Sequence, residues 1–449
     1  MSRLFGTDGV RGIVNRDLTP ELAFNLGKAG AYVLNKEKER PIIIIGKDTR
    51  ISGDLLTDAM SAGILSMGGN VIKVGVIPTP AIAFLVKHLH ADAGVVISAS
   101  HNTFEYNGIK FFNSDGFKLH DDLEDEIENI ITRDIDINGH IVGDKIGKCV
   151  EADDKALDYY VQHLLSVCDF DLKGRRIAVD CANGAGYRVA RKVLEKLNAQ
   201  VVTMACDPDG ININDNCGST KPEALKRFVL SQKADLGIAL DGDGDRLIAV
   251  SEKGELIDGD KAICICAKMM KERGCLEKDL VTVTVMSNLG LHKYLKDLSI
   301  ATDVTAVGDR YVLEKMLKTG CTLGGEQSGH IVFLNHATTG DGMLSALELI
   351  RAWVMDGRKI SEMADEICIY PQVLKNAVIK ESNKKKFERD QEIKKDIKVI
   401  EDMLNGEGRV LVRASGTEPL IRVMIEGPSM EQITFWAEEL KEKIRVRFG

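Results

Sequence analysis

Short apolar runs recur along the chain and alternate with segments of amphipathic pattern. Runs that are hydrophobic without alternation are typical of strands buried on both faces, as in parallel sheets covered by helices. Apolar residues recur at helical spacing between several of them, at 55–65, 185–197 and 311–317. The pattern predicts repeated α/β architecture. The apolar runs are 42–45, 71–76, 94–97, 177–179, 236–240, 281–285 and 304–307.

Three apolar runs lead into loops rich in polar residues. Run 94–97 is followed by SASHN, run 236–240 by DGDGDR, and segment 322–325 by EQSGH. Because ligands in open α/β sheets bind beyond the carboxyl ends of strands, these loops are compatible with three related units that face one cleft. No strong internal sequence repeat is visible, so the relation between the units rests on this pattern.

The C-terminal part differs. A charged tract at 380–398 separates the third unit from a shorter segment, in which 409–413 and 421–425 resemble strands and 431–446 resembles a helix. We therefore expect three α/β domains with parallel or mixed sheets and a smaller α+β C-terminal domain. The predicted domains are 1–150, 151–250, 251–370 and 371–449.

Composition narrows the class of protein. The 449 residues are 44% hydrophobic and 28% charged, as expected for a soluble globular protein of several domains. The net charge of -9 argues against nonspecific nucleic-acid binding, so an anionic ligand needs placed arginines, lysines or a metal ion. No signal-peptide pattern and no apolar run of membrane-spanning length occurs, so we expect neither a nucleic-acid nor a membrane partner.

The ten cysteines show no framework of close pairs. Cys264 and Cys266 lie in an apolar, helical-looking stretch, where packing in the core explains them better than metal binding. We expect reduced thiols and a cytoplasmic location.

Segment 241–246 (DGDGDR) has three carboxylates at alternate positions, separated by glycines. Such oxygen ligands suit one hard cation, and without a cation they would repel one another. A solvated acidic turn is the simpler alternative, although an apolar strand rarely ends with such dense charge. Glu252 has the position of the last EF-hand ligand, but Arg246 replaces the required glycine. Asp241 as the nucleophile of a phosphohydrolase is a further alternative.

Other loops also have compositions suited to ligands. Segment 413–419 (RASGTEP), followed by Arg422, combines hydroxyls, glycine and arginine as a phosphate cradle does, although a turn stabilised by Ser and Thr explains it equally well. Segment 324–330 (GGEQSGH) offers groups that suit sugar hydroxyls. The turns at 7–11, 47–50 and 308–310 add positive charge, and each on its own is interpreted as a surface ion pair.

Ser100 and His101 invite comparison with serine hydrolases. Adjacent residues on an extended chain point to opposite sides, and no Gly-x-Ser-x-Gly segment is present, so a catalytic triad is disfavoured. A serine that carries a phosphoryl group and shares a metal ion with the aspartates of 241–246 accounts for more of the sequence.

Six motifs in this order resemble those of the α-D-phosphohexomutase superfamily: TDGVRG, SASHN, NGIKFF, DGDGDR, GEQSGH and RASGTEPLIR. Together they span nearly the whole chain. The resemblance implies four domains around a central cleft and transfer of phosphate between O1 and O6 of a hexosamine phosphate. INDNCGSTKPE (213–223) and GEQSGH favour glucosamine 6-phosphate and glucosamine 1-phosphate, and a preference for mannose or glucose phosphates is the alternative within the superfamily.

The resemblance also implies a metal centre. Ser100 would be the phosphoserine in the first domain, and Arg246 would steady it. Mg²⁺ would be bound by Ser100, Asp241, Asp243 and Asp245.

Acid–base work is implied for Lys110 and His101, with Arg11 nearby. The third domain would bind the sugar and the fourth the distal phosphate. The substrate-binding residues would be Gly308, Arg310, Glu326, Ser328, His330, Arg413, Ser415, Gly416, Thr417 and Arg422.

Further expectations follow from the same resemblance. Glucosamine 1,6-bisphosphate or another phosphoryl donor would prime the serine, the product would feed UDP-N-acetylglucosamine and cell-wall precursor synthesis, and the expected assembly is a homodimer. An aspartyl-phosphate phosphohydrolase and a noncatalytic metal- or phosphosugar-binding protein are the alternatives from other classes.

The chain departs from the family's active loop at one position. The loop usually reads Ser-His-Asn-Pro, whereas Thr103 follows Asn102 here. Because proline would stiffen the loop and favour an extended Asn102, we expect unusual loop mobility at Thr103. The serine, the aspartates and the lysine are intact, so we still expect activity.

Overall fold

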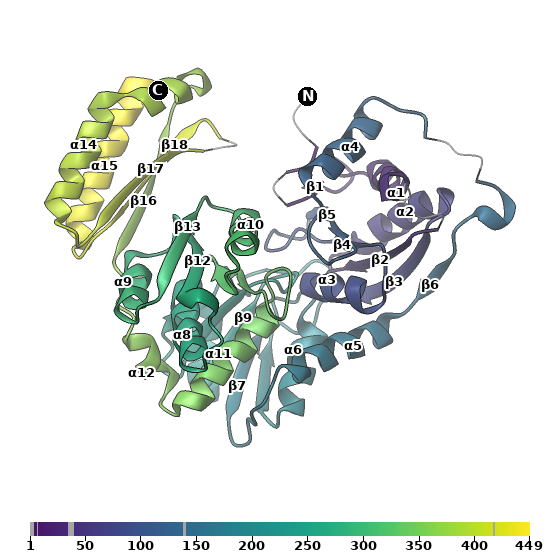
Figure 1. Cartoon of the computed structure of the whole chain (residues 1–449), viewed down its shortest axis with the longest axis horizontal. Helices are drawn as coiled ribbons and strands as arrows, with labels where there is room; N and C mark the ends of the chain where they lie inside the picture. The colour runs from purple at the N-terminus through teal and green to yellow at the C-terminus, as the bar shows by residue number, and fades with distance from the viewer. Residues whose placement is uncertain (1–3, 7, 35–39, 138–140, 416–417) are drawn as a thin grey trace. The chain divides into compact units, whose positions relative to one another are not determined.

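The computed structural model describes residues 4–6, 8–34, 40–137, 141–415 and 418–449, which form four sheets with packed helices (Figure 1). They divide into two compact units. Unit 1 is Met1–Met286 with Ser299–Glu366, and unit 2 is Ser287–Leu298 with Ile367–Gly449. Three α/β sheets lie in unit 1 and a smaller α+β domain in unit 2, as predicted.

The first sheet has the strand order β1-β5-β4-β2-β3-β6. Strands β2, β3, β4 and β6 run parallel, and β5 is antiparallel to both β4 and β1. Its elements are β1 (Val10–Ile13), α1 (Pro20–Leu34), β2 (Ile42–Lys47), α2 (Gly53–Ser66), β3 (Asn70–Val76), α3 (Thr79–His88), β4 (Ala93–Ile97), β5 (Tyr106–Asn113), α4 (Asp121–Thr132), the 3-10 turn η2 (Gly143–Lys145) and β6 (Cys149–Glu151).

The second sheet has the order β11-β10-β9-β7-β8, with β7, β8 and β9 parallel. Its core residues are mainly apolar side chains of β7, β9, β10 and α7. Its elements are α5 (Asp153–Ser166), β7 (Arg176–Asp180), α6 (Tyr187–Lys196), β8 (Gln200–Met204), α7 (Glu223–Gln232), β9 (Leu236–Leu240), β10 (Leu247–Ser251) and β11 (Leu256–Ile257).

The third sheet has the order β13-β12-β14-β15. The expected strand at 304–307 ends at Thr305 instead, and Val307 is exposed in the following loop. The elements along this part of the chain are α8 (Gly259–Glu272), η3 (Glu277–Asp279), β12 (Leu280–Thr284), α9 (Leu289–Asp297), β13 (Ala301–Thr305), α10 (Asp309–Thr319), β14 (Leu323–Gly325), β15 (Ile331–Phe333), α11 (Gly342–Asp356) and α12 (Ile360–Asp365).

Each of the three α/β sheets contains an antiparallel hairpin at a polar loop. The pairs are β4 with β5, β9 with β10, and β14 with β15. The sheets are therefore mixed, because the chain turns back directly after each loop instead of crossing over through a helix. This shared arrangement supports three related units.

Unit 2 contains a three-stranded antiparallel sheet in the order β16-β18-β17. The charged tract at 380–398 lies inside this domain, so its interpretation as a separator is wrong. Ile393, Ile400 and Leu404 of α14 are buried, and the charged positions form the solvent-facing side of an amphipathic helix. The elements are β16 (Gln372–Val378), η4 (Glu381–Asn383), α13 (Lys384–Arg389), α14 (Gln391–Leu404), β17 (Arg409–Ala414), β18 (Leu420–Glu426) and α15 (Met430–Phe448).

A fully buried carboxylate ties α9 to this C-terminal sheet. Glu426 at the end of β18 accepts hydrogen bonds from Leu289 N at 3.1 Å and from Arg409 Nε at 2.6 Å. It also accepts one from Gln372 Nε2 at 2.8 Å. Asn288 caps α9 and bonds to the backbone of Tyr370. Helix α9 therefore belongs to unit 2, although it follows β12 in the sequence.

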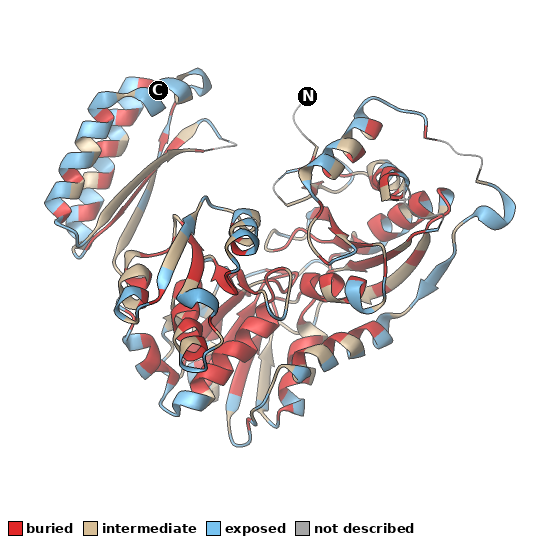
Figure 2. Cartoon of the chain, in the orientation of Figure 1, coloured by how far each residue is buried: buried red, intermediate tan, exposed pale blue. Residues whose placement is uncertain are grey.

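The core of unit 1 lies between the sheets and the faces of the helices that cover them (Figure 2). Cys264 and Cys266 are buried in α8, as expected. Among the described residues, no helix combines the length and the apolar character needed to cross a membrane.

Helices α1 and α2 approach closely through two glycines. A Cβ atom on Gly63 would lie 2.1 Å from the carbonyl oxygen of Phe24, and one on Gly27 would lie 2.3 Å from that of Met60. Both contacts are with backbone atoms, which a rotamer change cannot relieve. The glycines therefore set the distance between the two helices.

We expect Gly63→Val to destabilise unit 1 by about 1–3 kcal/mol, because the helices must separate to admit the side chain. The measurement is the first thermal or denaturant unfolding transition. Ala62→Val places the same side chain on the exposed side of α2 and is the matched control. Equal unfolding transitions for the two variants would contradict the packing argument.

Candidate active site

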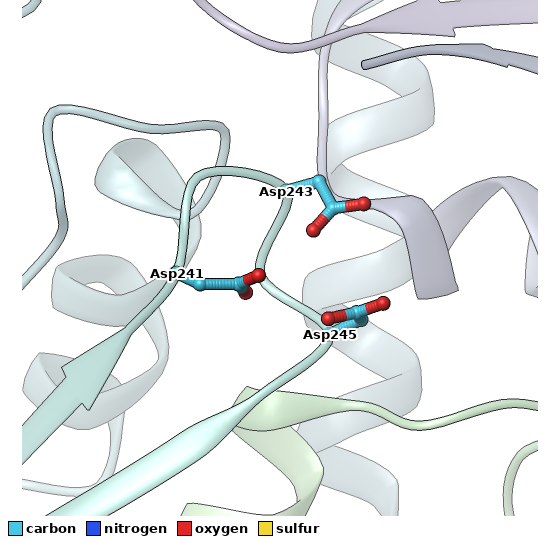
Figure 3. Close-up of side chains that lie close together, drawn as sticks. All are labelled: Asp241, Asp243 and Asp245. Atoms are coloured by element: carbon cyan, nitrogen blue, oxygen red, sulfur yellow. The ribbon is translucent and has the colours of Figure 1, made fainter. Parts of the chain in front are cut away.

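The three aspartates of 241–246 meet at the turn between β9 and β10 (Figure 3). One carboxylate oxygen from each residue lies within 4.8 Å of the others, and all three side chains are buried. In the described part of the chain, Asp243 Oδ1 and Asp245 Oδ1 have no hydrogen-bond partner. Three converging carboxylates, two of them with unpartnered oxygens, fit a hard divalent cation.

The three carboxylates repel one another, and this repulsion shifts their pKa values. Burial and the carboxylates of Asp245 and Asp243 raise the pKa of Asp241, and burial and Asp243 raise the pKa of Asp245. Burial acts on Asp243 in the same direction, but Lys110 lowers the pKa of Asp243 below its ordinary value. Lys110 Nζ lies 3.0 Å from Asp243 Oδ2. The turn needs positive charge to keep all three groups ionised.

Two helix N-termini hold this turn. At the start of α3, Thr79 donates from its backbone N to Asp243 O at 2.9 Å and from Oγ1 to Asp243 Oδ2 at 2.8 Å. At the start of α11, Gly342 N donates to Gly244 O at 3.0 Å. Both contacts place the positive end of a helix dipole beside the acidic turn.

Ser100 lies directly at the acidic turn. Its Oγ donates a hydrogen bond to Asp241 Oδ2 at 2.7 Å, and its side chain is buried. Its φ of 51° is in the left-handed region, which a non-glycine residue adopts only at some cost in free energy. Its backbone N donates to Ser98 Oγ at 3.0 Å, so the loop is held in this conformation locally.

The left-handed backbone corrects one argument from the sequence. Ser100 and His101 do not point to opposite sides, because Ser100 Oγ lies 3.3 Å from His101 Nδ1. Burial and the nearby cations of Arg246 and Arg11 lower the pKa of His101 to about 4. Within the described residues, no carboxylate is hydrogen-bonded to His101, so the arrangement is not a catalytic triad.

The Ser100 loop is clamped by a buried arginine. Arg50 Nη2 donates to the carbonyl oxygens of Ser100 at 2.9 Å and Asn102 at 2.8 Å, and Nη1 donates to that of Tyr106 at 3.0 Å and to that of Thr103. Arg50 is itself held by Asp48, which accepts from its Nε at 2.8 Å. The Asp48–Arg50 pair is therefore not a surface ion pair, whereas Lys47 of the same segment does pair with the exposed Asp54. Asp48 and Arg50 are buried because β2 ends beside β4.

A second clamp comes from the next α/β domain. Asn214 Nδ2 donates to Ser100 O and to Asn102 O, each at 2.9 Å. These contacts use carbonyl oxygens, which proline at position 103 would also leave in place. The loop is therefore held through the carbonyl oxygens of Ser100 and Asn102, and unusual mobility at Thr103 stays a prediction.

Charged side chains of alternating sign extend from the acidic turn. Lys110 Nζ lies 3.0 Å from both Asp243 Oδ2 and Asp8 Oδ2. Lys118 Nζ lies 2.7 Å from Asp8 Oδ1 and 2.5 Å from Asp309 Oδ2. This series of ion pairs links the acidic turn after β9 to the start of α10.

His330 closes this series of charges. Its Nε2 lies 3.6 Å from Asp309 Oδ2 and 3.9 Å from Asp245 Oδ2. This nitrogen is buried and has no hydrogen-bond partner among the described residues. A cavity of about 290 Å³ lies beside it, lined in part by Lys118, Asp309 and Arg310.

The two arginines predicted for the site also have unused donors. Arg11 forms an ion pair with Asp8, and the backbone N of Arg246 donates to Asp241 Oδ1 at 3.3 Å. In the described structure, the Nε atoms of Arg11 and Arg246 are buried and have no hydrogen-bond partner, although Arg246 Nε lies 3.8 Å from Asp245 Oδ1. These donors are available to an anion.

Three of the predicted sugar-binding residues lie together, and Arg310 is engaged elsewhere. Glu326 accepts a hydrogen bond from Gly308 N at 3.0 Å, and Ser328 Oγ lies 3.5 Å from Glu326 Oε2, so these three belong to one cluster. Arg310 is already paired with Asp121 and with Glu314.

Glu252 settles the EF-hand alternative. Its carboxylate accepts hydrogen bonds from Ser361 N at 3.3 Å and Ser361 Oγ at 2.6 Å. It is therefore engaged with α12, and the comparison with an EF-hand does not hold.

Unit 2 contains a separate basic site. Arg413 of β17 and Arg422 of β18 are directly opposite in the antiparallel register. Like charges in this position repel, and burial together with Arg422 lowers the pKa of Arg413. Ser415 is buried beside this pair at the end of β17, whereas Gly416 and Thr417 lie outside the described residues. Glu418 Oε2 already lies 3.2 Å from Arg422 Nη2, and a bound anion would further relieve the repulsion between the two arginines.

Sequence reasoning missed several residues of this constellation. Asp48 and Arg50 directly follow β2, so for them the rule that ligands bind beyond strand ends was a usable signal. Asp8 precedes β1 and Asn214 lies well beyond the end of β8, so that rule does not single them out. The missed residues are Asp8, Asp48, Arg50, Thr79, Lys118, Asn214 and Asp309.

Comparisons with known proteins agree with this architecture. Models of the phosphoglucomutase/phosphomannomutase family match alpha/beta/alpha domain I at residues 2–137, domain II at 158–254, domain III at 258–369 and the C-terminal domain at 374–443. A phosphoglucosamine mutase of Alkaliphilus oremlandii is 53% identical over 450 residues, which cover 100% of both chains.

Solved structures share the fold at low sequence identity. A phosphoglucomutase/phosphomannomutase family protein of Burkholderia thailandensis has a TM-score of 0.79 at 21% identity, covering 99% of this chain and 98% of that one. The N-acetylphosphoglucosamine mutase of Aspergillus fumigatus, in complex with GlcNAc-6P and magnesium, has a TM-score of 0.68 at 17% identity, covering 99% and 96%. By its full-length identity and its four matched domains, the chain belongs to the phosphoglucosamine mutase family, within the phosphoglucomutase/phosphomannomutase superfamily.

Proposed function

We propose that this isomerase interconverts glucosamine 6-phosphate and glucosamine 1-phosphate through a phosphoserine at Ser100 and a bound hexosamine 1,6-bisphosphate. The observation that carries the proposal is the 2.7 Å contact between Ser100 Oγ and Asp241 Oδ2, at the edge of a carboxylate cluster suited to a metal ion. The name of the Alkaliphilus relative supports glucosamine as the sugar.

Mg²⁺ is the metal ion that we propose for the cluster. Asp241, Asp243 and Asp245, with an oxygen of the Ser100 side chain or its phosphate, would hold it. The unpartnered oxygens of Asp243 and Asp245 support this fit, as does the magnesium in the Aspergillus complex. When bound, the ion neutralises charge on the phosphoryl oxygens.

Lys110 and the arginines would provide the remaining positive charge. Burial alone would lower the pKa of Lys110, but Asp243 and Asp8 raise it above its ordinary value, so Lys110 keeps its proton at neutral pH. A protonated lysine can stabilise the departing serine oxygen or give it a proton. The unpartnered Nε atoms of Arg246 and Arg11 support a role in binding phosphoryl oxygens.

In the first half-reaction the bond between Ser100 Oγ and phosphorus breaks, and a bond forms from a sugar hydroxyl oxygen to phosphorus. The hydroxyl proton passes to a base. His101 is the candidate, because its lowered pKa leaves the ring unprotonated at neutral pH and its Nδ1 lies 3.3 Å from Ser100 Oγ. The bisphosphate then turns around and returns its other phosphate to Ser100. The fixed loop around Ser100 keeps the transfer in line.

Substrate binding follows from the remaining groups. We assign Glu326, Ser328 and His330 to the sugar hydroxyls, together with Gly308, whose N–H holds Glu326. Arg310 would act only through its ion pairs.

The nonreacting phosphate is assigned to unit 2. We propose that Arg413 and Arg422, with Ser415 and the loop residues Gly416 and Thr417, bind a phosphate of the substrate. The like-charged pair of arginines across β17 and β18 supports this assignment.

The remaining expectations stay part of the proposal. They are a bisphosphate or other phosphoryl donor that primes Ser100, a cytoplasmic location, a homodimer, and a role in supplying UDP-N-acetylglucosamine and cell-wall precursors. The boundaries near 150, 250 and 370 are likewise proposed as the limits of the phosphoserine, metal-loop, sugar-binding and phosphate-binding domains.

Replacing Ser100 by alanine removes the oxygen that carries the phosphoryl group. We expect Ser100→Ala to lower turnover by more than about a thousandfold and to retain sugar-phosphate binding. Coupled assays and calorimetry measure the two effects. Ser114→Ala, on the exposed turn after β5, is the control.

Phosphate mapping by mass spectrometry completes this test. Wild-type protein treated with the bisphosphate should carry exchangeable phosphate on Ser100. Phosphate at Asp241 instead, or wild-type turnover by Ser100→Ala, would refute the assignment.

Metal binding should offset the repulsion among the aspartates. We expect Mg²⁺ to raise the melting temperature of the wild type by about 2–4 °C, and that of Asp245→Asn by less than about 1 °C. In EDTA the variant should melt above the wild type, because one buried negative charge is gone. Asp115→Asn, an exposed substitution, should respond to Mg²⁺ as the wild type does. An undiminished response of Asp245→Asn would contradict the proposed ligand set.

The planar fork of Arg50 binds four carbonyl oxygens, which a lysine cannot do. Arg50→Lys keeps the charge beside Asp48, so we expect a folded protein whose kcat falls about tenfold to a hundredfold because Ser100 is misplaced. Steady-state kinetics and circular dichroism measure the two properties. Arg40→Lys, at an exposed position, should leave kcat unchanged. A normal kcat for Arg50→Lys would show that the clamp is dispensable.

A further inference from the structure

Two cysteines lie at the ends of neighbouring parallel strands in the second sheet. Cys181 directly follows β7, and Cys206 lies two positions after β8. The register pairs Asp180 with Met204, and Cys181 N continues the ladder with a 3.2 Å hydrogen bond to Met204 O. Cys206 is therefore offset by one residue from the position opposite Cys181.

The ends of β7 and β8 stay adjacent beyond the two strands. Asn183 N donates to Ala205 O at 2.7 Å, and the φ of 46° at Ala205 bends the chain there before it reaches Cys206. Disulfides usually span about 4.4–6.8 Å between Cα atoms, which residues at adjacent strand ends can reach. The two thiols are close enough for each to shift the pKa of the other, and the Cys206 thiol also donates to Tyr187 O at 3.6 Å.

The environment distinguishes the roles of the two thiols. Cys206 is partly exposed, whereas Cys181 is buried. The hydrogen bond from Cys181 lowers the pKa of Cys206 to about 7, and the same hydrogen bond together with burial raises the pKa of Cys181. Cys206 is thus the accessible nucleophile, and Cys181 is the thiol next to it. The nearby Cys217 is buried, and burial raises its pKa to about 12.

We propose that Cys181 and Cys206 are a redox-active pair that a hydroperoxide converts into a disulfide. The Cys206 thiolate attacks the peroxide oxygen, the O–O bond breaks, and a sulfenic acid forms with release of water or an alcohol. The sulfur of Cys181 then attacks the sulfur of Cys206, its proton leaves with the hydroxide as water, and the S–S bond forms. Two electrons pass from the two sulfurs to the peroxide, and a dithiol reductant reverses the change.

The pair lies beneath the loops of the active site. Ala182 O accepts a hydrogen bond from Asn214 N at 2.9 Å, and Asn214 in turn clamps the Ser100 loop. Ala185 N donates to Gly242 O in the acidic turn at 2.8 Å. A covalent bond at Cys181 therefore restrains the segment that supports both loops, so we expect oxidation to lower turnover. This consequence rests on the proposed function, whereas the disulfide itself does not.

The disulfide is tested by treating the reduced full chain with a small excess of hydrogen peroxide and alkylating the remaining thiols. We expect two fewer alkylated cysteines than in the untreated chain. Trypsin with Asp-N separates Cys206 from Cys217, because Asp207 and Asp215 lie between them. A crosslinked peptide that joins Cys181 to Cys206 supports the proposal. A bond to Cys217 instead, or no crosslink, overturns it.

Variants test the effect on turnover. We expect peroxide to reduce wild-type turnover severalfold and dithiothreitol to restore it. Cys206→Ser should have normal basal turnover and should resist peroxide, whereas the exposed control Cys368→Ser should lose turnover as the wild type does. Equal loss in Cys206→Ser would assign the inactivation to another group. A crosslink without any change in turnover would refute the coupling to the active site. If the chain has no mutase activity under any condition, the proposed function fails, and the crosslink is still decided by peptide mapping.

Discussion

Three carboxylates buried in one turn are the constraint on which the site depends. They cannot all remain ionised without positive charge, and the chain places Lys110, Arg246 and two helix N-termini around them. Among the described residues, Oδ1 of Asp243 and Oδ1 of Asp245 accept no hydrogen bond, and the three carboxylates could hold a metal ion. Negative charge on Asp8 and positive charge on Lys118 continue the same alternation to Asp309 at the start of α10. The acidic turn thus determines where charge must lie across three domains.

The sequence predicted those site residues that directly follow a buried strand along the chain. Ser100 and the acidic turn each follow a buried strand, and their composition is unusual enough to indicate chemistry. Arg50 and Asn214 were missed because their role depends on which strands become neighbours. An arginine in a turn looks like a surface residue until the sheet order places it under a loop 50 residues away.

The fold was predictable to the level of α/β domains, because periodicity reports burial. It does not report direction. A buried strand such as β5 has the same apolar pattern whether it runs parallel or antiparallel, so the return strands were visible only in the sheet. The charged tract at 380–398 was misinterpreted for a related reason. High charge density hid the buried stripe of α14, whose few apolar residues suffice to cover a small sheet.

The buried Glu426 has a consequence for how such chains can be recombined. Its partners come from Leu289 as well as from Arg409, so the C-terminal module is discontinuous in sequence. A fragment cut at residue 374, where the C-terminal family match begins, keeps the glutamate and loses the cap of α9 that satisfies it. Exchange of C-terminal domains between related chains therefore keeps the hydrogen bonds of this buried carboxylate only in two cases. Either α9 is exchanged together with the sheet, or both parent chains have the same contact between the glutamate and α9.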